Sequence, residues 1–357
     1  MNTQAIRAMA FFILIWLVLF SRDGFALVVL QYHHVSTETP PATSIAPERF
    51  AQHMAWLAEN QYQVLSMPDL LNLLQGNKTL PDKAVVITFD DGYTSIYHAA
   101  WPVLRKYNWP FTVFVNSQHH DEKNRHYMSW EQLREMAKAG ITIGNHSVSH
   151  AHMIRRQVEE KEADWLARSR REIEDAQKRI DAEVGRQLRV FAYPFGEHNP
   201  ALESLLEELG YIAFAQHSGA IASFDSLRGL PRFPFGGSYS DIKDFAVKAS
   251  SLPMPIKKVA LLDEKGRSIQ DPLVSEKTAK VTLVIEGNVD ILKKISCFYV
   301  GEPAATEIRD GQLHVTASKA IPSGRSKFNC TAPDKGRFYW FSKMVIKKNK
   351  DGSWYKE

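Results

Sequence analysis

Short apolar segments alternate with amphipathic helical patterns from Val28 to about Phe235 of this 357-residue chain. Segments rich in apolar and β-branched residues predict strands at 27–32, 64–66, 84–89, 111–116, 141–144, 190–193, 212–216 and 230–233. Apolar residues recur at helical spacing between them, over 47–59, 130–136, 163–184 and 200–209. This alternation is typical of an α/β fold with a parallel (β/α) barrel, and we expect an incomplete or distorted one. The chemistry of such barrels gathers at the carboxyl ends of the strands.

The pattern changes after residues 250–256, a segment with two prolines that we interpret as a linker. Before it, residues 27–249 form the expected barrel domain. Beyond it, residues 257–357 carry β-rich segments without clear helical patterns, at 281–285, 295–300, 313–316 and 338–346. They predict a small C-terminal β-sandwich.

Residues 1–26 have the pattern of a secretory signal peptide. Arg7 supplies a positive start, residues 8–20 are apolar, and Gly24-Phe25-Ala26 fits a small-x-small cleavage site. The apolar stretch is shorter than the about 20 residues of a membrane span, so an uncleaved anchor is the less favoured alternative. We therefore expect an exported protein of the periplasm or cell envelope.

The two cysteines of the chain, Cys297 and Cys330, both lie in the expected β-sandwich. Disulfides persist outside the cytoplasm, so an even cysteine count in an exported protein favours a bond between them. Two unrelated buried thiols are the alternative. The formal net charge of +4 is too small to indicate a nucleic-acid partner.

Two adjacent acids, Asp90 and Asp91, follow the apolar strand at 84–89 and precede Gly92. Two carboxylates at the tip of a buried strand are costly unless a metal, a proton or a cation offsets their repulsion. Because successive residues of an extended chain point to opposite sides, one acid can bind a metal while the other faces a substrate. A helix-capping acid followed by a turn is the alternative.

Two histidines, His146 and His150, follow the strand at 141–144. Their spacing puts both imidazoles on one face if the chain makes a single helical turn. Two histidines and one carboxylate form a three-ligand site with an open position for water. We therefore predict one divalent metal ion, with zinc as the expected ion, bound by Asp91, His146 and His150. His152 is expected at the surface or behind the ligands.

These residues resemble a known family. Thr88-Phe89-Asp90-Asp91 and His146-Ser147-Val148-Ser149-His150 are similar to the first two motifs of the polysaccharide deacetylases, the NodB-homology group or carbohydrate esterase family 4. The resemblance covers about residues 28–249 and implies a metal-dependent hydrolase that removes acetyl groups from sugars. It also implies that Asp90 is the general base and Asp91 the acidic metal ligand. The metal would polarise the acetyl carbonyl and acidify a water molecule, from which Asp90 would take a proton.

A third segment, Ala192-Tyr193-Pro194-Phe195-Gly196, resembles the family motif that supplies a backbone donor for the oxyanion. The resemblance assigns that donor to the amide of Phe195. Family members often carry an arginine in this motif, which braces the catalytic aspartate, whereas this chain has Ala192 and Tyr193. Arg232, on a neighbouring predicted strand, is a candidate substitute, and a salt-bridged residue of the barrel rim is the alternative.

The late Leu-x-His motif that supplies the general acid in the family is not evident in this chain. His217, near a strand end, is one candidate substitute, and His33 and His34 are others. Similar departures occur in the deacetylases of exported poly-N-acetylglucosamine. Met128-Ser129-Trp130 also resembles that branch.

The resemblance implies N-deacetylation of an N-acetylglucosamine-containing polysaccharide in the cell envelope. We expect substrate contacts from residues at the barrel rim, namely His33, Tyr93, Trp130 and Tyr193. The expected partner is the acetylated glycan, and envelope or exopolysaccharide-export proteins are further candidates. An O-acetyl esterase acting on xylan-like glycans, and a weakly active or inactive carbohydrate-binding protein, are the alternatives.

Overall fold

The structure is a computed structural model that describes residues 26–76, 81 and 83–356. The predicted signal peptide lies outside the described residues except for its last residue, Ala26, which is buried at the start of the first strand. In the described part of the chain, no helix combines the length and the apolar character needed to span a membrane.

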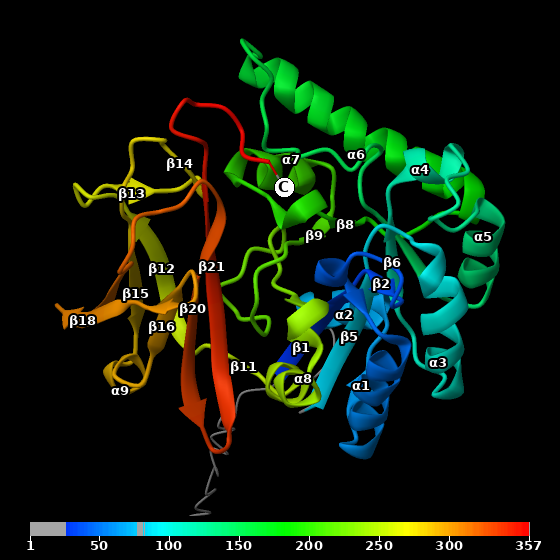
Figure 1. The fold of residues 1–357 in the computed structure, drawn as a ribbon, viewed down its shortest axis with the longest axis horizontal. Coiled ribbons are helices and arrows are strands. Elements are labelled where there is room, and N and C mark those ends of the chain that lie inside the picture. Colours follow the sequence, from blue (N-terminus) through cyan, green and yellow to red (C-terminus); the bar gives the residue numbers. More distant parts are fainter. Residues whose placement is uncertain (1–25, 77–80, 82, 357) are drawn as a thin grey trace, which may run out of the picture.

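A sheet of parallel strands forms the centre of the N-terminal part (Figure 1). Its order is β10-β1-β5-β6-β7-β8-β9, with β4 paired to the first half of β5. Every predicted strand of this region overlaps an observed one, although the boundaries differ by up to three residues. The observed strands are β1 (Ala26–Tyr32), β4 (Gln63–Val64), β5 (Lys83–Phe89), β6 (Thr112–Val115), β7 (Thr142–Asn145), β8 (Val190–Ala192), β9 (Ile212–Phe214) and β10 (Phe233–Pro234).

Residues 230–234 join the two edges of this sheet. Leu230 forms a parallel bridge to Phe214 of β9, and three residues later Phe233 of β10 pairs with Leu30 of β1. The sheet therefore curls into a distorted parallel barrel, which confirms the predicted fold class. The carboxyl ends of β1, β5, β7 and β8 consequently lie along one rim.

Helices cover the outside of the sheet (Figure 1), and side chains cap several of them. Ser129 forms a capping box with Gln132 at α5, and Ser66, Asn199 and Asp241 accept hydrogen bonds from the first turns of α2, α7 and α8. The helices are α1 (Pro47–Glu59), α2 (Met67–Leu74), α3 (Trp101–Lys106), α4 (Ser117–Asp121), α5 (Trp130–Lys138), α6 (Glu162–Val184), α7 (Pro200–Glu208) and α8 (Ile242–Ala249).

The C-terminal part consists of two facing sheets, as the predicted β-sandwich requires. One has the order β11-β21-β20-β16-β17 with β14 beside β21, and the other has the order β13-β12-β15-β19-β18. The first sheet contains β11 (Leu252–Pro253), β14 (Leu273–Val274), β16 (Ser296–Tyr299), β17 (Glu302–Pro303), β20 (Gly324–Asp334) and β21 (Arg337–Lys347). The second contains β12 (Ile256–Leu262), β13 (Ser268–Ile269), β15 (Thr282–Gly287), β18 (Ala305–Arg309) and β19 (Gln312–Thr316).

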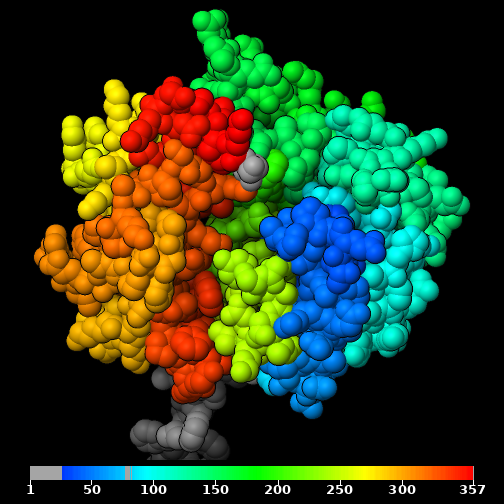
Figure 2. Space-filling model, in the orientation of Figure 1, coloured from blue at the N-terminus to red at the C-terminus, as the bar shows by residue number. Residues whose placement is uncertain are grey.

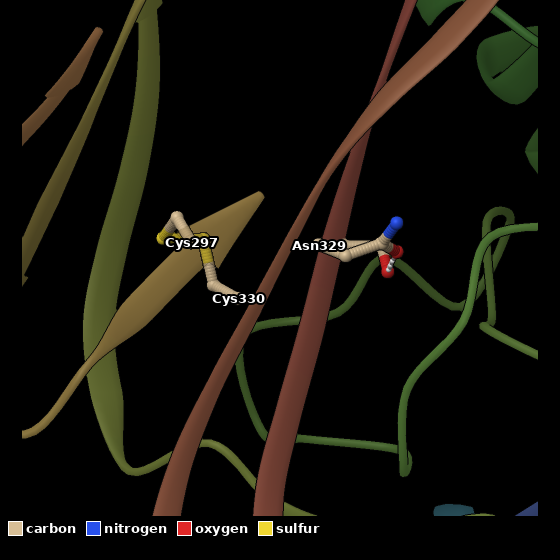
Figure 3. The surroundings of a disulfide bond; sticks show 4 residues. Cys297, Asn329 and Cys330 are labelled. Carbon is tan, nitrogen blue, oxygen red and sulfur yellow. Dashed lines mark hydrogen bonds between the residues drawn. A yellow bond between two sulfur atoms is a disulfide. The ribbon is translucent and has the colours of Figure 1, made fainter. Parts of the chain in front are cut away.

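The expected disulfide is present in this sandwich. Cys297 of β16 and Cys330 of β20 are directly opposed in the antiparallel register, and their sulfur atoms are 2.00 Å apart. Figure 3 shows the disulfide between the two strands and the neighbouring side chain of Asn329 directed away from it. Alternate residues of β20 therefore face the sandwich core and the opposite side of the sheet.

That opposite side of the sheet packs on the barrel. The ring of Trp340 lies 5.3 Å from that of Phe233, and Met344 and Ile346 join an apolar cluster that includes Phe191 and Tyr193 of the barrel. β11 lies within the segment expected to be a linker, where it pairs with β21. The two parts of the chain thus lie side by side and in contact (Figure 2).

A buried histidine, His53 of α1, should make stability depend on pH. Its Nδ1 atom lies 3.1 Å from the Tyr32 hydroxyl and its Nε2 atom 3.0 Å from the Ser240 carbonyl oxygen. Burial lowers the pKa of His53 from 6.5 to about 4. The unfolded chain binds a proton at His53 more readily than the folded chain does. The contribution of neutral His53 to the stability of the fold is therefore complete above pH 6.5 and is lost as the pH falls towards 4.

The free energy of unfolding is therefore expected to fall over this range, by up to about 3 kcal/mol from His53 alone. Denaturant unfolding at a series of pH values measures it. His53→Gln should show a shallower slope, whereas His98→Gln, which alters an exposed histidine, should keep the native slope. Equal slopes for the native protein and His53→Gln would contradict the assignment.

Candidate metal centre and active site

Three potential metal ligands meet at the rim of the barrel. Asp91 follows β5, and His146 and His150 follow β7. The Nε2 atoms of His146 and His150 lie 3.4 and 3.3 Å from Oδ1 of Asp91, and one ligand atom from each residue falls within 4.8 Å of the others. The structure therefore brings together the three residues that the sequence predicted as metal ligands.

The donor atoms of this cluster suit a divalent cation. Oδ1 of Asp91 is buried and has no hydrogen-bond partner among the described residues. Nδ1 of His146 lies 2.7 Å from the carbonyl oxygen of Ala192, which favours a proton on Nδ1 and leaves the lone pair of Nε2 facing Asp91. An unpaired buried carboxylate oxygen opposite two imidazole nitrogens fits the ligand preference of zinc and similar ions.

The electrostatics of Asp91 and His150 also favour ligand-competent forms, whereas burial of His146 is outweighed by its interaction with Asp91, which raises the pKa of His146. Burial alone would raise the pKa of Asp91, but the interaction with His146 and the charges of His150 and His33 outweigh it and lower this pKa. Burial and the neighbouring His146 lower the pKa of His150 to about 4. At neutral pH the carboxylate is thus ionised and the His150 ring is neutral.

The segment between the two histidines is a loop, not the helical turn expected from their spacing. Ser147 and His150 both have positive φ values, of 71° and 56°. The carboxylate of Glu172 in α6 accepts hydrogen bonds from the backbone amides of Val148 and Ser149, at 3.0 and 2.9 Å. Because Glu172 satisfies these amides from outside, the segment can hold both imidazoles together without a helix.

Asp90 is paired with Arg232 in the interior of the barrel. Nη1 and Nη2 of Arg232 each donate to one carboxylate oxygen of Asp90, both at 2.7 Å, and Gln31 donates to Oδ2 at 2.6 Å. Both residues of the pair are almost completely buried, with 2% and 0% of their surfaces exposed. Burial opposes ionisation of Asp90, but the charge of Arg232 prevails and lowers its pKa. The structure therefore places a guanidinium where the sequence suggested a substitute for the missing arginine.

Phe195 lies in a tight turn after β8, residues Pro194–Gly196, and its φ value is 59°. Its ring stacks on that of His152 at 3.6 Å between centroids and lies 4.6 Å from the ring of His150. The turn is therefore in direct contact with His150, one of the candidate metal ligands, as a donor for an oxyanion at this site must be.

Two other predicted residues lie close to the cluster. The charge of His33 contributes to lowering the pKa values of Asp90 and Asp91, and its side chain is half-buried. Tyr93 stacks on His34 at 3.5 Å, and burial followed by the Asp91 charge raises the pKa of its hydroxyl. Tyr93 therefore stays protonated and neutral beside the cluster.

Three residues that the sequence predicted as substrate contacts or as the general acid lie in other environments. Trp130 is 8% exposed and donates from Nε1 to Asp121, and Tyr193 is 1% exposed and donates to the Arg228 carbonyl. Packing of α5 on the barrel buries Trp130, and the apolar cluster that the barrel forms with α6, α7 and the sandwich buries Tyr193, so neither ring offers a face to a sugar. His217 lines a separate cavity of about 380 Å³ with His198 and Lys343, and burial followed by the His198 charge lowers its pKa.

Several residues of the site were not predicted from the sequence. Gln31 gave a usable signal, because it is a polar residue within an otherwise apolar strand. Glu172 gave none, since it is one of many charged residues along α6. The same holds for Arg325 of β20, whose Nη1 donates to the carbonyl oxygen of Phe195 at 2.6 Å.

Comparison with known proteins agrees with this geometry. Residues 77–214 match the family model described as "Polysaccharide deacetylase". The chain is 32% identical over 185 residues to the Bacillus subtilis protein named "Putative polysaccharide deacetylase YxkH", covering 52% of this chain and 62% of the relative. It is 27% identical over 259 residues to the poly-beta-1,6-N-acetyl-D-glucosamine N-deacetylase of Escherichia coli K12, covering 63% of this chain and 38% of the relative. The chain thus spans less than two thirds of the length of either relative.

Solved structures show the same fold. IcaB from Ammonifex degensii superposes with a TM-score of 0.56 at 27% identity, covering 64% of this chain and 98% of that one. The Streptococcus pyogenes deacetylase PplD superposes with a TM-score of 0.57 at 20% identity, covering 63% of this chain and 99% of that one. At 20% identity the second comparison supports the fold alone.

Proposed function

We propose, from the match of residues 77–214 to the polysaccharide deacetylase family, that this chain hydrolyses N-acetyl groups of an N-acetylglucosamine-containing polysaccharide. The observation that carries this proposal is the juxtaposition of the Asp91, His146 and His150 cluster with the Asp90–Arg232 pair on one barrel rim. A pure carbohydrate-binding protein does not need a buried base beside its cation site. The name of the Escherichia coli relative supports the choice of substrate.

We assign the residues the following roles. Asp91, His146 and His150 would hold one divalent cation, for which zinc is our choice, and it would supply Lewis-acid polarisation of the acetyl carbonyl and a more acidic water. Asp90, kept ionised by Arg232, accepts a proton from the attacking water. The Phe195 amide donates to the oxygen that becomes negative.

The remaining role is that of the general acid, which must protonate the leaving amine. Of the candidate histidines, His33 is close enough to both carboxylates to influence their pKa values, whereas His217 lines the other cavity. We therefore favour His33, with Tyr93, which stacks on the adjacent residue His34, as a substrate contact. We also propose that the protein is exported to the cell envelope, where such polysaccharides are assembled.

The purified protein is expected to bind about one divalent ion per chain and to release acetate from N-acetylglucosamine oligomers. Chelation should abolish acetate release, and added zinc should restore it, because the buried Asp91 oxygen lacks another partner among the described residues. Elemental analysis and an acetate assay measure both properties. Faster release from acetylated xylan at equal acetyl concentration would replace N-deacetylation with an esterase activity, and metal binding without release from either substrate would contradict an enzyme.

A further inference from the structure

The β-sandwich reaches the Phe195 turn through one side chain, Arg325 of β20. Besides donating to the Phe195 carbonyl oxygen, its guanidinium lies 5.5 Å from the centroid of the Phe195 ring. Its Nε atom lies 3.9 Å from the carboxylate of Glu197. One guanidinium from the C-terminal part thus contacts the middle residue of the Pro194–Gly196 turn and the residue that follows the turn.

This turn has a conformation that needs external support. Phe195 has φ and ψ values of 59° and 4°, and Gly196 follows with a φ of 69°. A left-handed conformation of a bulky residue costs about 1–3 kcal/mol and persists only when its surroundings impose it. A Cβ atom on Gly196 would lie 2.2 Å from Cβ of Gln216, so the turn also packs closely against the segment that follows β9.

Glu197 ties the turn to the end of the chain. Its carboxylate is fully buried, accepts a hydrogen bond from the Tyr355 hydroxyl and lies 2.8 Å from Nδ1 of His152. Burial and the Glu197 charge raise the pKa of Tyr355, which therefore remains the donor. Arg325 of the sandwich lies within ion-pair distance of this carboxylate.

The turn also contacts one candidate metal ligand, since the Phe195 ring packs on His150 as well as on His152. Next to it lies a cavity of about 200 Å³, lined on the barrel side by Phe195, Gln216 and Pro234. Arg325, Ser326, Lys327 and Met344 of the sandwich line its other side. Both parts of the chain therefore form the immediate surroundings of the site.

We propose that the β-sandwich completes the active site, with Arg325 as a positioning residue that holds the Phe195 turn against His150 and His152. Its effect on catalysis rests on the proposed function, whereas its effect on the turn does not. Without the guanidinium, the turn is free to leave its left-handed conformation, and the Phe195 amide moves away from the reacting carbonyl.

Arg325→Met tests the proposal, with Arg337→Met as the matched control. Arg337 of β21 also donates from Nε to a carbonyl oxygen outside the sandwich sheet, that of Ser250 at 2.7 Å, but this contact is with the C-cap of α8. Hydrogen–deuterium exchange of the peptide that contains the Phe195 turn is measured for each full-length variant, together with kcat, KM and metal content. Arg325→Lys provides the conservative substitution.

Arg325→Met is expected to accelerate exchange in the turn at least about tenfold and to lower kcat by about 10- to 100-fold, with KM and metal content nearly unchanged. Arg325→Lys should recover part of both effects, and Arg337→Met should match the native protein. Native exchange and kcat in Arg325→Met, or equal losses in the two methionine variants, would overturn the proposal. If the native protein releases no acetate, the proposed function fails, and the exchange measurement alone decides the role of Arg325.

Discussion

Replacing Asp90 with asparagine is expected to lower kcat for acetate release by about 10²- to 10⁴-fold while the metal content stays the same. Asparagine has nearly the same shape as aspartate but cannot accept a proton from water. The metal should remain because Asp91, His146 and His150 form the cation site without Asp90. Acetate release and elemental analysis of Asp90→Asn and the native protein provide the measurement.

Two further variants separate the base from the ligands. His146→Ala removes one nitrogen of the cluster and should lose both metal and activity. Asp244→Asn changes a half-exposed carboxylate paired with Lys248 in α8 and should behave like the native protein. Full activity in Asp90→Asn would show that another group accepts the proton.

Arg232→Met is expected to lower the free energy of unfolding by about 3–5 kcal/mol. The substitution leaves the carboxylate of Asp90 buried without the two hydrogen bonds that offset its desolvation. Because Arg232 is the principal group that lowers the pKa of Asp90, this pKa should rise, and the acidic limb of the kcat/KM profile should move to higher pH. Denaturant unfolding and a pH–rate profile measure the two effects.

A surface ion pair provides the control for this variant. Arg49 and Asp241 are 3.2 Å apart, but their side chains are 39% and 56% exposed. Arg49→Met should therefore cost less than about 1 kcal/mol. A similar cost for Arg49→Met and Arg232→Met would mean that the buried pair contributes no more than a solvent-exposed one.

The sequence alone determined the parts of this protein that depend on local patterns. Apolar periodicity predicted the barrel strands, because burial on both faces requires near-continuous apolar runs. Ligand residue types after two such runs predicted the meeting of Asp91 with His146 and His150, because the carboxyl ends of parallel strands share one rim. The count of two cysteines predicted the disulfide, since only one intramolecular pairing exists.

The tertiary structure alone decided which distant residues meet. Arg232 reaches Asp90, 142 positions earlier, because residues 230–234 join the two edges of the sheet. Packing of the sandwich on the barrel brings Arg325 to Phe195 and encloses His217 in a separate cavity. A sequence pattern records whether a residue is apolar or charged and how often that recurs. It does not record which surface will cover the residue, because long-range packing depends on every intervening element at once.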